Sequence, residues 1–184
     1  PDSIEIMRHI DSKYPNQGEY LFPYSQGDDS FNKLLDFVTL DETKELGETL
    51  GTTAGGISAQ LLVKMLCKRS LISVIWDYTT KHSIKKRIPI FIMLRILGKP
   101  PKSLCKKMTI MLAKHLVTIE EVLSHKKQFM MGEAYTAIDC CMTSILHRVQ
   151  EMRFSSVLNS DKLPNLSTYW KTISQRDSYK EGIL

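Results

Sequence analysis

The sequence predicts an all-α protein. Apolar residues recur at three- and four-residue spacing in every strongly periodic segment, which is the period of a helix buried on one face. No alternating, β-branched run indicates a strand. The chain has 184 residues, 42% of them hydrophobic and 24% charged, so it is long enough for one domain with a core of its own.

The first expected element is a short helix within residues 1–15, PDSIEIMRHIDSKYP. Asp2 or Ser3 can cap its N-terminus, since both side chains accept hydrogen bonds from the free amides of a first turn. Pro15 is expected to stop it. Residues 16–27 contain Gly, Pro and Asn, and we expect them to form a linker.

Three longer segments follow in the middle of the chain. A helix is expected from about residue 29 to residue 50, and the motif GTTAGG at residues 51–56 is expected to break or kink it. An apolar segment at residues 57–78 comes next. A further helix is expected at residues 102–125, where apolar side chains again keep helical spacing.

The stretch GEAYTAIDCC predicts a firmly capped helix from residue 136 to about residue 152. The hydroxyl of Thr136 can accept a hydrogen bond from the amide of Asp139, whose carboxylate can reach back to the amide of Thr136. Such a cap contributes about 0.5–2 kcal/mol, so we interpret both residues as fold determinants. A shorter helix is expected to follow, with Pro164 near its start, the position that proline tolerates best.

Three sequence elements occur here in the order that one known family uses. The first is residues 1–15, and the second and third are a Gly-x-x-(aromatic)-Ser/Thr-x-x-Asp element and a Pro-Asn-Leu-x-x-(Tyr/Trp) helix. The last two are represented by Gly132, Tyr135, Thr136, Asp139, Pro164, Asn165, Leu166, Tyr169, Trp170 and Tyr179. The chain therefore resembles the glutathione S-transferase superfamily. Within it, the ganglioside-induced differentiation-associated protein and reductive-dehalogenase-like branches are the most similar.

The resemblance implies a domain organisation. Residues 1–15 would be the last helix of a thioredoxin-like domain whose other parts are absent from these 184 residues, and residues 16–27 would be the linker. Residues 28–184 would form the family's C-terminal helical bundle, with a basic and apolar insertion at about residues 79–103.

The resemblance also implies a cofactor, glutathione. In the family, the position of Asp2 and Ser3 holds the γ-glutamyl end of glutathione, and the free amides and partial positive charge of a helix N-terminus suit a carboxylate. Ordinary helix capping by these two residues is the competing interpretation. The family's thiol-activating residue lies in the thioredoxin-like half, so no catalytic residue is assigned in this chain, and that half is expected upstream.

The resemblance places an acceptor-substrate wall on the second helix and its continuation. A mixed core and solvent face is the competing interpretation for the same positions. The residues concerned are Leu35, Val38, Thr39 and Glu42.

Cysteine and histidine usage predicts no metal site. The four cysteines form no Cys-x-x-Cys pair and the five histidines are scattered. Reduced thiols and the lack of a signal-peptide pattern favour an intracellular protein of the cytoplasm or an organelle, with a membrane surface as a further location, rather than a secreted one. The apolar run at residues 88–97 is too short to span a bilayer.

Residues 79–119 contain ten Lys or Arg and no Asp or Glu. Three interpretations stay open for this basic region: a solvated face, a docking patch, or a nucleic-acid site, which is the least favoured because only Phe91 could stack on a base. The docking patch would bind a protein partner or an anionic membrane surface through residues 79–107. Its expected members are Lys85, Lys86, Arg87, Arg95 and Lys99.

Two functions remain at this point. The first is a non-catalytic scaffold or accessory subunit that docks through the basic and apolar insertion, and it is preferred because of that insertion and because the thiol-activating residue is not in the chain. The alternative is a glutathione-dependent transferase or reductase acting on small electrophiles, with its catalytic half upstream. Whether the protein is an enzyme, and whether it forms a homodimer, both stay open.

Overall fold

A computed structural model describes residues 3–15, 20–23, 29–41, 43–80, 88–125, 128–152, 155–158 and 161–183. Every element of regular secondary structure within these ranges is an α-helix. In the same ranges, a single isolated β-bridge joins Phe129 and Gly132. The prediction of an all-α fold is therefore confirmed.

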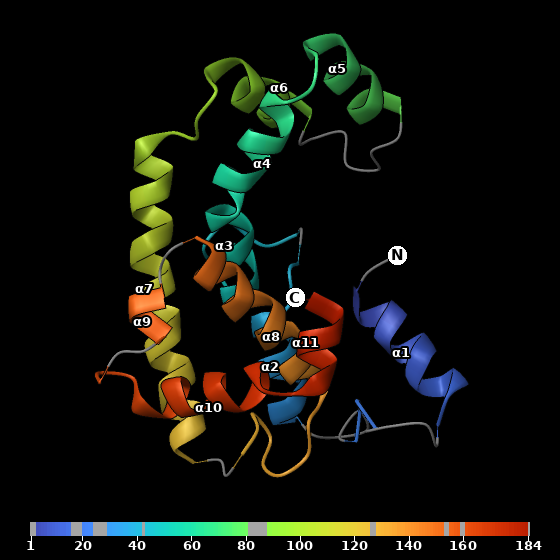
Figure 1. The fold of residues 1–184 in the computed structure, drawn as a ribbon, viewed down its shortest axis with the longest axis vertical. Helices are drawn as coiled ribbons and strands as arrows, with labels where there is room; N and C mark the ends of the chain where they lie inside the picture. Colours follow the sequence, from blue (N-terminus) through green and yellow to red (C-terminus); the bar gives the residue numbers. More distant parts are fainter. Residues whose placement is uncertain are drawn as a thin grey trace.

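Within the described ranges, six helices precede residue 98: α1 Ser3–Lys13, α2 Asp29–Val38, α3 Leu50–Ile57, α4 Ala59–Cys67, α5 Leu71–Thr80 and α6 Ile88–Leu97. Five more are described after it: α7 Lys102–Ser124, α8 Ala137–Glu151, α9 Ser155–Leu158, α10 Pro164–Ser174 and α11 Asp177–Ile183. In Figure 1, α7 runs along one side and α4 rises beside it to α5 and α6 at the upper end, while α2, α8 and α10 gather at the lower end.

Three helices expected from the sequence begin and end close to where the periodicity placed them. The first is α1, which ends at Lys13, two residues before Pro15. The second is α7, which covers the expected segment at residues 102–125. The third is α8, which has Thr136 as its N-cap and ends at Glu151.

The prediction of a helix at residues 29–50 is wrong in its C-terminal half. The prediction of a helix break at GTTAGG is also wrong. Helix α2 ends at Val38, and the motif lies inside α3. A capping box starts α3, because the Thr52 amide donates to Thr49 Oγ1 at 3.2 Å and the Thr49 amide donates to Thr52 Oγ1 at 3.0 Å. In a continuous helix, carbonyl groups of the preceding turn would accept from these amides. Here the hydroxyls of the two threonines accept instead.

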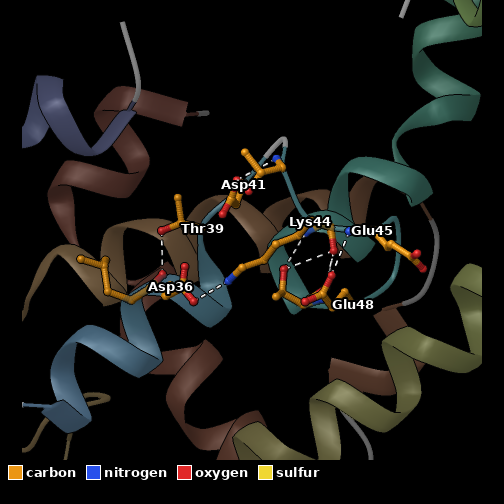
Figure 2. Close-up of polar contacts among 10 residues, drawn as sticks. Asp36, Thr39, Asp41, Lys44, Glu45 and Glu48 are labelled. Atoms are coloured by element: carbon orange, nitrogen blue, oxygen red, sulfur yellow. Dashed lines mark hydrogen bonds and ion pairs between the residues drawn. The ribbon is translucent and has the colours of Figure 1, made fainter. Parts of the chain in front are cut away.

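The loop between α2 and α3 holds itself in place through side chains, as Figure 2 shows. Lys44 forms an ion pair with Asp36 at the end of α2. The amide of Thr43 donates to Asp41 Oδ1 at 2.8 Å, and the amide of Glu45 donates to a Glu48 carboxylate oxygen at 2.9 Å. These local bonds compete with helix continuation, which explains the end of α2.

The apolar segment at residues 57–78 is two helices rather than one. Helix α4 ends at Cys67, and α5 begins at Leu71. The Ser73 amide donates to Ser70 Oγ at 3.2 Å, so Ser70 caps the new helix. The cap allows the chain to turn at residues 68–70 without leaving the first amides of α5 unsatisfied.

The main core lies where α2, α3, α7, α8 and α10 meet. Its largest fully buried side chains are Phe31, Leu50, Met108, Leu116, Ile119, Met130, Ile138, Met142, Leu146, Leu158 and Leu166. A second, smaller cluster of Val63, Leu66, Val74 and Leu94 joins α4, α5 and α6. The upper end in Figure 1 therefore has a small core of its own.

Helix α10 is capped by a side chain from another helix. Leu163 at its N-cap makes no side-chain capping bond. Instead, Glu120 of α7 accepts from the amide of Asn165 at 2.9 Å and from the amide of Leu166 at 2.7 Å. A carboxylate at a helix N-terminus is also favoured by the helix dipole.

We expect Glu120→Gln to lower the free energy of unfolding by about 1–2 kcal/mol, because an amide group can accept only at one of its two ends and carries no charge. Glu121→Gln is the matched control, since this exposed neighbour leaves the α10 cap intact. Urea denaturation of both variants measures the difference. Equal midpoints would show that the α10 cap does not contribute to stability.

Candidate functional site

The start of α8 is organised around the buried carboxylate of Asp139. One oxygen, Oδ2, accepts from the Thr136 amide at 2.8 Å and from the Thr136 hydroxyl at 2.9 Å. The other, Oδ1, accepts from the Met130 amide at 3.0 Å and from the Tyr169 hydroxyl at 2.8 Å. The carboxylate therefore joins the connector before α8, the N-terminus of α8 and the middle of α10.

Burial raises the pKa of Asp139 above its ordinary value, while the hydrogen bonds from Met130, Thr136 and Tyr169 oppose that rise. Burial and the neighbouring carboxylate also raise the pKa of Tyr169 well above its ordinary value, so its hydroxyl keeps the proton that it donates. Every group around Asp139 is a donor within the fold. The capping box that the sequence predicts at Thr136 and Asp139 is present, and both carboxylate oxygens of Asp139 accept two hydrogen bonds each.

Ser3, one of the two residues predicted to hold glutathione, is the first residue of α1 and is exposed. Its predicted companion, Asp2, lies outside the described residues. Helix α1 lies beside α11 in Figure 1, and its Ile4 and Met7 side chains pack against the main core. The assignment of both residues to glutathione stays a prediction.

The residues predicted to form an acceptor-substrate wall fall into different environments. Leu35 and Val38 are buried in the main core. Thr39 is half-buried, and its hydroxyl donates to the carbonyl oxygen of Leu35 at 2.6 Å (Figure 2). Glu42 lies outside the described residues. Leu35 and Val38 thus contact the main core, and Thr39 bonds within the C-terminal turn of α2.

The predicted docking residues are also only partly described. Lys85, Lys86 and Arg87 lie outside the described residues, and Lys99 is exposed. Arg95 of α6 is half-buried, and its Nε and Nη2 atoms donate to the carbonyl oxygen of Arg69 at 3.1 and 2.9 Å. Its guanidinium therefore holds the turn between α4 and α5, to which Arg69 belongs.

Helices α5 and α6 carry apolar side chains that face solvent. The most exposed are Ile72 at 81%, Trp76 at 67% and Ile96 at 67%. On each helix these side chains have i, i+3, i+4 spacing and so share one side of it. We call this set the α5–α6 face: Ile72, Ile75 and Trp76 on α5, with Met93, Ile96 and Leu97 on α6.

Sequence reasoning singled out the apolar run that contains α6 but missed the contribution of α5. A helical spacing of apolar residues was visible in both. The spacing alone does not show which side of each helix is buried. Val74 on α5 and Leu94 on α6 belong to the same apolar segments, and both are buried in the second cluster. The exposed side is thus a property of the packing.

A separate cleft of about 400 Å³ lies where α1 meets α8 and α11. Tyr14, Tyr135 and Tyr179 line it together with Arg176, whose guanidinium is 4.1 Å from the centre of the Tyr135 ring. Of the predicted site residues that the structure describes, none lines this cleft. Its walls come from both ends of the chain, so no local motif could have indicated it.

Within the described part of the chain, no group of three or more His, Cys, Asp or Glu side chains could hold a metal ion. In the same residues, none of the helices combines the length and apolar character needed to cross a membrane.

Comparison with known proteins gives two similarities. The family described as glutathione S-transferase, C-terminal domain, matches residues 84–177. The crystal structure of the beta-etherase LigF from Sphingobium sp. strain SYK-6 is similar with a TM-score of 0.75 and 18% sequence identity, over 98% of this chain and 72% of that one. At this identity the likeness concerns the fold. A search of curated proteins found no match.

Proposed function

The chain belongs to the glutathione S-transferase family, and from that premise we propose that it is a scaffold or accessory subunit that docks through the α5–α6 face. The observation that carries the proposal is the exposure of large apolar side chains on two neighbouring helices. Large exposed apolar patches mark interaction sites in proteins that are otherwise polar outside.

Hydrophobic burial supports docking energetically. A fully buried Ile or similar side chain contributes about 1.5–3 kcal/mol relative to an exposed one. Ile72, Trp76 and Ile96 leave most of that unrealised in the isolated chain. A partner that covered them would recover it, at the cost of the freedom lost on association.

The charge around this end of the molecule supports the same proposal. Exposed lysines follow α6 and begin α7, at Lys99, Lys102, Lys106 and Lys107. No acidic residue occurs in residues 79–119 to neutralise them. Each basic residue close to an anionic surface contributes about 1 kcal/mol of attraction. The partner is therefore expected to be negatively charged.

Family membership favours a second candidate, a glutathione-dependent transferase or reductase acting on small electrophiles. In this function Asp2 and Ser3 would hold the γ-glutamyl end of glutathione, because a helix N-terminus attracts a carboxylate. Glutathione would then be a substrate bound at the N-terminus of α1, while the α5–α6 face would act separately.

The two functions predict different behaviour of the full-length protein. For a non-catalytic scaffold, we expect no turnover of aryl-halide electrophiles with glutathione above the uncatalysed rate. Retention on immobilised glutathione together with measurable turnover, both reduced by Ser3→Ala, would overturn the scaffold role and establish the transferase.

Docking through the basic end is tested by charge reversal. We expect Lys85→Glu, Lys86→Glu and Arg87→Glu together to reduce, by at least tenfold, the amount of full-length protein that sediments with its partner fraction from cell extracts at low salt. The control combines Lys33→Glu, Lys171→Glu and Lys180→Glu, which change the net charge equally at exposed sites of α2, α10 and α11. An equal effect of both triplets would contradict a docking site at residues 79–107.

A further inference from the structure

We propose that the partner of the α5–α6 face is an anionic lipid surface, on which α5 and α6 lie within the headgroup layer. The inference rests on the proposed docking function and names the chemistry of the partner.

The shape of the α6 side favours a lipid surface over a folded protein. Its apolar surface is lined by Pro89, Ile92, Met93, Ile96 and Leu97. These residues are spaced i, i+3, i+4, i+7 and i+8 and all belong to α6, so among the residues that the structure describes no second element provides an opposite wall. A groove for a partner's helix needs two walls. Lipid chains can surround a single apolar ridge without one.

The charges lie beside the apolar ridge rather than on it. Arg95 is the only charged residue of α6, and its guanidinium is turned to the carbonyl oxygen of Arg69. The exposed lysines begin just after the helix, at Lys99 and Lys102. An apolar helix side with lysines at its border is the arrangement of interfacial helices, whose basic groups contact lipid phosphates while their apolar side chains enter the acyl boundary.

The helices are too short to cross a bilayer, so the proposed contact is with its surface. Helices α5 and α6 have 10 residues each. At about 1.5 Å per residue each is roughly 15 Å long, half the thickness of a hydrocarbon core. Trp76 on the exposed side of α5 is a residue type that concentrates at the membrane–water interface.

Trp76 provides a direct readout. It is 67% exposed, whereas Trp170 is buried in the core at 7%. We expect vesicles of phosphatidylcholine with phosphatidylserine to shift the emission of the full-length protein to the blue and to protect it from acrylamide. Both changes should be absent in Trp76→Phe and absent with phosphatidylcholine alone.

Matched variants separate insertion from general charge attraction. Ile72→Glu with Ile96→Glu is expected to reduce vesicle flotation at least tenfold. Ile6→Glu with Val117→Glu changes the net charge equally at sites that are 47% and 49% exposed on α1 and α7, and it should float like the unmodified protein. Far-UV circular dichroism establishes that both double variants are folded.

Three outcomes would overturn the inference: no flotation with anionic vesicles at low salt, equal loss in the two double variants, or flotation without a change at Trp76. The docking function would survive the first outcome if Ile72→Glu with Ile96→Glu still abolished sedimentation with the partner fraction, since the partner would then be a protein. If that double variant sedimented normally as well, both the inference and the docking function would fail.

Discussion

Replacing Gly51 with alanine is expected to lower the free energy of unfolding by about 3 kcal/mol. A Cβ atom at this position would lie 2.1 Å from the carbonyl oxygen of Thr39, 2.3 Å from its carbonyl carbon and 2.7 Å from the amide nitrogen of Leu40. All three are backbone atoms, so no side-chain rotation relieves the overlap. The first turn of α3 would have to move away from the end of α2.

Gly55 offers a control within the same helix. A Cβ there would meet only Leu40 Cδ1, at 3.2 Å, and that side chain is exposed and can rotate. Since alanine favours helix over glycine by up to about 1 kcal/mol, Gly55→Ala is expected to be neutral or stabilising. Urea denaturation of the two variants, followed by circular dichroism, should separate their midpoints clearly. Equal midpoints would contradict the close approach of α3 to residues 39 and 40.

Asp139→Ala is expected to cost about 4 kcal/mol, because it leaves four buried donors without their acceptor. Asp139→Asn should cost less. Its remaining oxygen can still accept from Met130 and Tyr169, while its amide group cannot accept from Thr136. Tyr169→Phe removes one donor only and should cost about 1.5–3 kcal/mol, the range for a hydrogen bond to a charged group.

The expected order of destabilisation is therefore Asp139→Ala, then Asp139→Asn, with Asp161→Asn unchanged as an exposed control. Chemical denaturation monitored by fluorescence and by circular dichroism measures the order. A double-variant cycle of Asp139→Asn with Tyr169→Phe tests the contact directly. Strictly additive effects would show that the 2.8 Å bond between the two side chains contributes nothing.

The local part of this site could be predicted from the sequence and the tertiary part could not. The spacing of Thr136 and Asp139 indicates a capping box, because both partners lie within one turn. The other two donors come from Met130, in the connector, and Tyr169, 30 residues later. Neither spacing is characteristic of any local motif, so the full set of partners is known only from the fold.

The same distinction explains the error at GTTAGG. Glycines in a row predict a break when only local propensity is considered. In the fold, Gly51 lies against the backbone of Thr39, where any Cβ would overlap, and Gly56 lies against the side chain of Met108. Packing thus selects glycine inside a helix for the space that it leaves, at a cost in helix propensity.

The sequence by itself determined the helical class, the positions of α1, α7 and α8, the cap at Thr136 and the resemblance to a family that the match at residues 84–177 confirms. Each of these depends on spacings within a few turns of helix. Only the tertiary structure decided that Leu35 and Val38 are core residues, that Arg95 holds the turn between α4 and α5, and that α5 and α6 keep an apolar side in solvent. Burial results from contacts between residues far apart in the chain, and periodicity cannot tell which of two apolar sides such contacts will cover.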